Sequence, residues 1–176
     1  IISTINLAKK LNKQYPSNHF VPVYWMATED HDFEEINYFN LHGKKVLWNK
    51  KASGAVGRLS TEGLEEVFDV FAAELGHLGL TDDLKTLFQK AYLEHDTLTE
   101  ATRYLANALF GEEGLVIVDG DDKALKKLLV PYAKADMLEH VPYQKINKTI
   151  EALQEASSDY TIQVNPREIN YFYLED

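Results

Sequence analysis

Two short, continuous apolar runs constrain the fold of this chain more than any other feature. The first covers residues 20–27 and the second residues 115–118, and both are rich in β-branched or aromatic residues. Runs of this length without polar alternation are typical of strands that are buried on both faces of a sheet. We therefore expect Tyr24 and Trp25 in the core. Pro22 cannot donate to a sheet ladder, so we place it near the start of its strand.

Helical periodicity surrounds these two runs. Thr97 is followed three residues later by Glu100, which predicts a capping box at the start of a helix. The other expected helices cover residues 1–14, 62–75, 82–93, a segment ending near 130, and most of 132–157. Helices that alternate with buried strands predict an α/β fold with a Rossmann-like, mostly parallel sheet.

Three further segments have the pattern of strands. Residues 36–41 and 44–48 flank His42-Gly43, a two-residue hairpin turn. Residues 160–164 alternate between apolar and polar side chains, and residues 171–176 form an aromatic run. We expect a single Rossmann-like core fragment over 1–176, with helical insertions at about 60–93 and 131–157.

Composition excludes several classes of function. The chain has 18 Lys and Arg against 28 Asp and Glu, a net charge of −10, which disfavours binding to nucleic acid or anionic lipid. It has no cysteine, so it contains neither a disulfide nor a thiolate nucleophile. Without an apolar run of about 18 residues, we expect no membrane span. These features fit a reducing, cytoplasmic compartment.

The first expected strand ends in the most concentrated cluster of ionisable residues in the chain. Glu29, Asp30, Asp32, Glu34 and Glu35 surround a single imidazole, His31. Such a cluster binds a substrate ammonium, holds Mg²⁺ or acts as a general base. The structural alternative is a helix start in which Asp32 is the N-cap and Glu35 the third helical residue.

Two other polar clusters follow expected strands. Arg167, within the Asn165–Asn170 segment, could clamp a carboxylate or phosphate, or simply hold its turn against Glu168. Asp119 could accept a ribose hydroxyl, although its neighbour Asp121 is also a good N-cap for the next helix. Residues 28–35 and 165–170 both follow expected strands whose carboxyl ends should point the same way. We therefore expect the two segments to meet at one edge, where ligands of such sheets bind.

A weaker pattern, Gly54-Ala55-Val56-Gly57-Arg58, could cradle an anion. Two glycines alone are an unspecific signal, and the chain has no Walker or dinucleotide fingerprint. No histidine pair has metal-ligand spacing, so we assign no firm metal site.

Three segments resemble one known family. They are PVYWMATEDHDFEEI at 22–36, EATRYL at 100–105 through GLVIVD at 114–119, and NPREINYFY at 165–173. This sequence is similar to the cysteine-adding enzymes of bacillithiol synthesis, the BshC family. The resemblance implies a core related to nucleotidyl transferases and class I synthetases, with helical insertions and a C-terminal coiled coil.

The resemblance also implies a function. The parent enzyme would be a carbon–nitrogen ligase that joins cysteine to glucosaminyl-malate in the last step of bacillithiol synthesis, with ATP as the cosubstrate that fold kinship suggests. On these grounds we assign Asp30, His31 and Asp32 as catalytic residues. The expected substrate-binding residues are Thr28, Glu29, Glu35, Asn165, Arg167 and Asn170, and Asp119 is a weaker candidate for cofactor binding.

One departure from the family concerns a Gly-Gln-Gln motif that precedes the first helix in the family and is absent here. We therefore expect an internal fragment that does not catalyse alone. The alternative function is a non-catalytic Rossmann-like domain that binds a nucleotide or a partner, with the helical arm at 132–157 available for a homodimer.

Overall fold

The computed structural model describes residues 1–76 and 79–171. The chain divides into two compact units, Ile1–Asp122 and Lys123–Asp176. Each unit is described by itself. The first unit contains, in chain order, α1 (Ile2–Gln14), β1 (Val23–Met26), α2 (Phe33–Ile36), β2 (Tyr38–Leu41), β3 (Lys44–Leu47), the 3₁₀ turn η1 (Val56–Arg58), α3 (Leu64–Leu75), α4 (Thr81–Tyr92), α5 (Leu98–Phe110), the 3₁₀ turn η2 (Gly111–Glu113) and β4 (Val116–Asp119).

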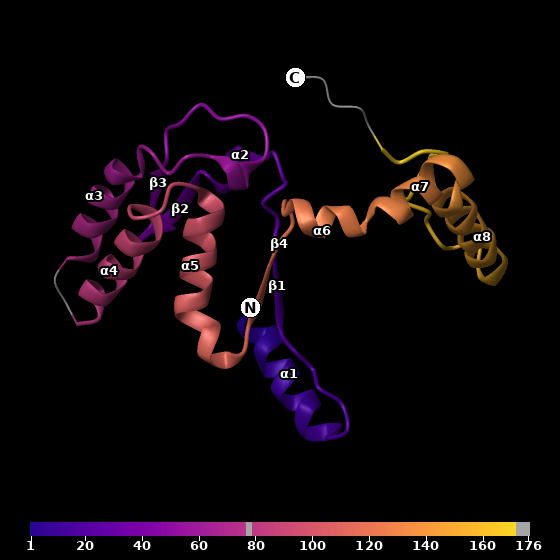
Figure 1. Cartoon of the computed structure of the whole chain (residues 1–176), viewed down its shortest axis with the longest axis horizontal. Helices are drawn as coiled ribbons and strands as arrows, with labels where there is room; N and C mark the ends of the chain where they lie inside the picture. Colours follow the sequence, from indigo (N-terminus) through magenta and orange to yellow (C-terminus); the bar gives the residue numbers. More distant parts are fainter. Residues whose placement is uncertain (77–78, 172–176) are drawn as a thin grey trace. The chain divides into compact units, whose positions relative to one another are not determined.

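The two apolar runs form a parallel pair. β1 and β4 lie side by side with Val23 opposite Val116 and Met26 opposite Asp119 (Figure 1). Pro22 lies one residue before β1, as predicted, and its carbonyl accepts a bond from the Val116 amide. Because the strands are parallel, their carboxyl ends meet at one edge, where Thr28 and Asp119 come together.

The prediction that β1 is buried on both faces is wrong. Met26 is 2% exposed, but Trp25 on the opposite face is 57% exposed and Val23 is also exposed. The physical reason is that β1 pairs only with β4 among the described residues, and no described helix covers the face that carries Trp25. Trp25 is therefore a surface residue here.

The predicted hairpin is confirmed. β2 and β3 are antiparallel, and His42 and Gly43 both adopt positive φ, as a tight two-residue hairpin turn requires. The hairpin packs with α2, α3 and η1 around a core of Phe33, Val46, Trp48, Val56, Leu64 and Val67. The ring of Phe33 meets that of Trp48 edge-on at 5.3 Å between centroids.

Helix α5 positions the strand ends and begins as predicted. The Thr97 hydroxyl accepts the Glu100 amide, and the Glu100 carboxylate accepts the Thr97 amide, which completes the capping box. The Leu98 amide donates to the Leu59 carbonyl, and Thr99 Oγ1 donates to the Gly57 carbonyl at 2.8 Å. These bonds attach the start of α5 to the η1 turn.

The second unit contains α6 (Lys123–Leu128), α7 (Val130–Glu139) and α8 (Val141–Ala156). Pro131 and Pro142 lie in the first turns of α7 and α8, where the missing amide costs little. The predicted strand at 160–164 is wrong, because residues 157–171 have no helix or strand. Ile162 and Val164 instead lie beside Ile150 on α8, where no neighbouring strand offers a ladder. Of the predicted strand at 171–176, all but Tyr171 lies outside the described residues.

No helix in the described part of the chain combines the length and apolar character needed to cross a membrane.

Candidate functional site

The acidic cluster occupies a tight turn between β1 and α2. One Asp30 carboxylate oxygen accepts the amides of His31 at 2.6 Å and Asp32 at 3.3 Å, which fixes the turn. The main chain of the turn is bonded to the η1 loop, since the Val56 amide donates to the Asp30 carbonyl and the Gly57 amide to the Thr28 carbonyl. The cluster is therefore held by its backbone, and its side chains face solvent.

The alternative reading as a capped helix start is only partly right. Asp32 occupies the N-cap position of α2, but its side chain makes no capping bond, and α2 has four residues. His31 lies between two carboxylates, with Nδ1 3.5 Å from Asp30 and Nε2 3.6 Å from Asp32. These are ion-pair distances for a protonated imidazole, too long for good hydrogen bonds.

The same three residues have the only set of ligand atoms, among residues 1–76 and 79–171, that could together hold a metal ion. Their ligand atoms lie within 4.8 Å of one another and all three residues are exposed. Exposed carboxylates and an imidazole suit a weakly held divalent cation. Because Asp30, His31 and Asp32 are all exposed to solvent, no catalytic step is assigned to a metal at this site.

An open groove of about 660 Å³ runs beside the cluster and carries both signs of charge. Asp32, Glu34 and Glu35 line it together with Lys50 and Lys51. The Lys50 ammonium is already engaged, since it donates to the Ser60 carbonyl at 2.8 Å and lies 5.1 Å from the centre of the Trp48 ring. A groove with acidic and basic walls can bind a zwitterion in one orientation.

Thr28 links the ends of the two parallel strands. It is buried, its hydroxyl donates to Asp119 Oδ1, and the same hydroxyl accepts the Asp121 amide at 3.0 Å. The second Asp119 oxygen lies 3.3 Å from the guanidinium of Arg103 on α5. Thr28 and Asp119 therefore lie together at the ends of the two strands, and both already bind protein groups.

Arg58 was part of the weak glycine pattern, and the structure gives it a specific partner. Its guanidinium forms a two-bond fork with Asp121, with distances of 2.5 and 2.9 Å. The hydrogen bonds and the negative charge of Asp121 raise the pKa of Arg58 above its usual value. The fork attaches the η1 loop to the end of β4. Sequence reasoning missed this pair because 63 residues separate its members.

The Glu29 side chain lies against Gly120, the residue that follows β4. Its carboxylate accepts the indole N–H of Trp25 at 3.3 Å and lies where a Cβ on Gly120 would be. Gly120 thus leaves room for a carboxylate between the two strand ends. The predicted residues Thr28, Glu29, Asp30, His31, Asp32, Glu35 and Asp119 all belong to this edge of the first unit.

The remaining predicted residues belong to the second unit. The expectation that residues 165–170 meet residues 28–35 rested on a strand at 160–164 that is absent, and a meeting of the two segments stays a prediction. Asn170 donates its amide N–H and its side-chain NH₂ to the two oxygens of Asp136, each at 3.1 Å, and Asp136 is 3% exposed. Asn165 and Arg167 are exposed.

Comparison with known proteins identifies the family. The family model for the N-terminal Rossmann-like domain of bacillithiol biosynthesis BshC matches residues 1–176. A Flavobacterium johnsoniae protein named "Putative cysteine ligase BshC" is 59% identical over 176 residues, which are 100% of this chain and 32% of that protein. A protein of the same name from Christiangramia forsetii is 56% identical, over 100% of this chain and 33% of its own length.

More distant relatives carry the same name. The Staphylococcus haemolyticus protein is 30% identical over 165 residues, which are 88% of this chain and 30% of that protein. The chain therefore spans about a third of the length of the curated relatives it matches. The parallel β1–β4 pair, together with the helices that precede and separate its strands, agrees with a Rossmann-like α/β domain. With a family match over its whole length, this chain belongs to the Rossmann-like N-terminal domain family of BshC.

Proposed function

We propose that this chain forms part of a ligase that joins cysteine to glucosaminyl-malate. Its relatives are named as cysteine ligases, and its family model is named for bacillithiol biosynthesis. The observation that carries the proposal is the mixed-charge groove beside the acidic turn, at the edge where parallel sheets bind their ligands.

The groove suits an amino acid. Cysteine carries an ammonium and a carboxylate, and one wall offers the carboxylates of Asp32 and Glu35 while the other offers Lys51. In this arrangement the acidic wall holds the ammonium and Lys51 attracts the carboxylate, which fixes the direction of the bound substrate.

Formation of the carbon–nitrogen bond needs two further contributions. The attacking amine must lose a proton, and Asp30, His31 and Asp32 provide acceptors within one turn. The carboxyl group must be activated, and we propose ATP as the co-reactant that removes the elements of water. Arg167, on the second unit, is proposed to contact a substrate carboxylate or a phosphate.

The test uses the full-length protein that contains this chain. Asp30→Asn, His31→Ala and Asp32→Asn variants are assayed for joining of cysteine to glucosaminyl-malate, with Asp69→Asn on the exposed face of α3 as the matched control. Loss of a general base lowers turnover on the order of 10²–10⁴-fold, and loss of an ammonium contact raises KM for cysteine.

Unchanged turnover and KM in all three folded variants would contradict the proposal. That result would favour the alternative of a non-catalytic domain that binds a nucleotide or a partner protein.

A further inference from the structure

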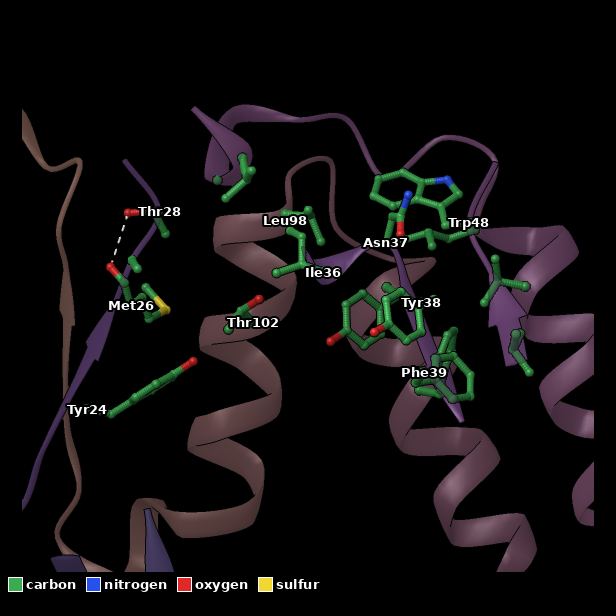
Figure 2. Close-up of a pocket in the computed structure, with 18 residues that line it drawn as sticks. Tyr24, Met26, Thr28, Ile36, Asn37, Tyr38, Phe39, Trp48, Leu98 and Thr102 are labelled. Carbon is green, nitrogen blue, oxygen red and sulfur yellow. Dashed lines mark hydrogen bonds between the residues drawn. The ribbon is translucent and has the colours of Figure 1, made fainter. Parts of the chain in front are cut away.

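The first unit contains a second cavity whose chemistry differs from that of the acidic groove. It measures about 340 Å³ and lies against the face of β1 that carries Tyr24 and Met26. Figure 2 shows β1 on one side, Tyr38 and Phe39 of the hairpin on the other, and Thr102 of α5 between them. We call it the tyrosine cavity, after Tyr24, Tyr38 and Tyr92 in its wall.

The tyrosine cavity has no charged wall. None of the described residues that line it is Asp, Glu, Lys, Arg or His, and six of them are aromatic: Tyr24, Tyr38, Phe39, Trp48, Phe88 and Tyr92. A carboxylate, phosphate or ammonium placed there would lose its hydration without gaining an opposite charge. Its occupant must therefore be uncharged, unlike both substrates of the proposed ligase.

The wall also offers hydrogen bonds that the protein does not use. The hydroxyls of Tyr24, Tyr92 and Thr102 make no hydrogen bond with another protein group within residues 1–76 and 79–171. In Figure 2 the Tyr24 hydroxyl points from β1 toward the side of the cavity where Thr102 lies. Burial, and then the neighbouring Tyr24, raise the pKa of Tyr92, so its hydroxyl stays neutral at physiological pH.

We propose that the tyrosine cavity binds an uncharged aromatic heterocycle with hydrogen-bonding groups at its ring edge. The apolar and aromatic walls take the faces of the ring, and the hydroxyls of Tyr24, Tyr92 and Thr102 bind its edge. The cavity volume lies at the lower end of the range for small-molecule sites, which suits one or two fused rings and excludes a large ligand.

The test measures binding of adenine, as a neutral heterocyclic probe, to the full-length protein by isothermal titration calorimetry at pH 8. Tyr24→Phe and Tyr92→Phe each remove one hydroxyl and keep the ring, and each should weaken adenine binding roughly fivefold. Thr102→Met places a longer side chain in the cavity and should abolish binding. Tyr15→Phe removes the hydroxyl of an exposed tyrosine that does not line the cavity, and it should leave binding unchanged.

Thermal melting of the same variants separates binding from folding. Because the two tyrosine hydroxyls make no hydrogen bond with the described protein, their removal should not lower Tm, so weaker binding with unchanged Tm supports the proposal. The proposal is overturned if adenine does not bind the folded wild-type protein, if all variants bind equally, or if malate displaces adenine. Adenine is also the base of ATP, the proposed co-reactant, so the same protein is assayed for joining of cysteine to glucosaminyl-malate. Absence of adenine binding in a protein that still joins the two substrates overturns this proposal alone, so its failure is distinct from failure of the proposed function.

Discussion

Replacement of Asn170 by alanine tests whether this residue serves the fold or a substrate. Its side-chain NH₂ donates to Asp136 Oδ1 at 3.1 Å, and Asp136 is almost fully buried. A hydrogen bond to a charged group contributes about 1.5–3 kcal/mol, and here its loss leaves a buried carboxylate with one donor fewer. The backbone bond from the Asn170 amide to Asp136 Oδ2 remains possible in the variant.

The expected result is a local loss of stability. Each 1.4 kcal/mol is a factor of ten, so the Asn170 amide should exchange with solvent about 10- to 150-fold faster in Asn170→Ala. Hydrogen–deuterium exchange of the full-length protein, read on peptides that cover residues 165–171, measures this change. Gln163→Ala is the matched control, because this exposed amide side chain lies in the same segment and is not among the expected substrate-binding residues.

Equal exchange in the two variants would refute the structural role of the Asn170–Asp136 bond. If exchange is equal while KM for a substrate rises only in Asn170→Ala, then Asn170 contacts substrate, as the sequence analysis predicted.

Three further predictions concern the first unit. In Gly120→Ala the new Cβ meets only the end of the flexible Glu29 side chain, so Tm should stay within about 2 °C while KM for cysteine rises. An unchanged KM would remove Glu29 from the site. In Gly57→Ala the Cβ meets the Cβ of buried Thr28, and urea denaturation should show a loss of about 1–3 kcal/mol. The raised pKa of Tyr92 contributes stability that is complete below the unfolded pKa of 10.0 and is lost as pH rises above it. Tyr92→Phe should therefore flatten the alkaline decline in Tm. A decline in the variant that runs parallel to that of the wild-type protein would contradict this reasoning.

Local sequence patterns predicted the elements whose stability depends on near neighbours. The capping box at Thr97 and Glu100 and the positive-φ turn at His42 and Gly43 each satisfy their backbone within a few residues. The family resemblance was likewise carried by continuous segments, and the family match confirms it.

Patterns that needed a distant partner were predicted less well. The alternation at 160–164 is the same whether a strand or α8 lies beside it, so it wrongly indicated a strand. Trp25 lies in an apolar run that is typical of a buried strand. It is exposed because, among the described residues, no layer covers its face of β1.

The sequence by itself determined that an acidic turn follows a parallel strand, because strand and turn are adjacent in the chain. Only the tertiary structure decided which groups surround that turn. The Arg58–Asp121 fork and the Thr28–Asp119 bond each join residues more than 60 positions apart. The tyrosine cavity likewise draws its hydroxyls from β1, α4 and α5. Such contacts depend on how separate elements pack, and no local periodicity records that packing.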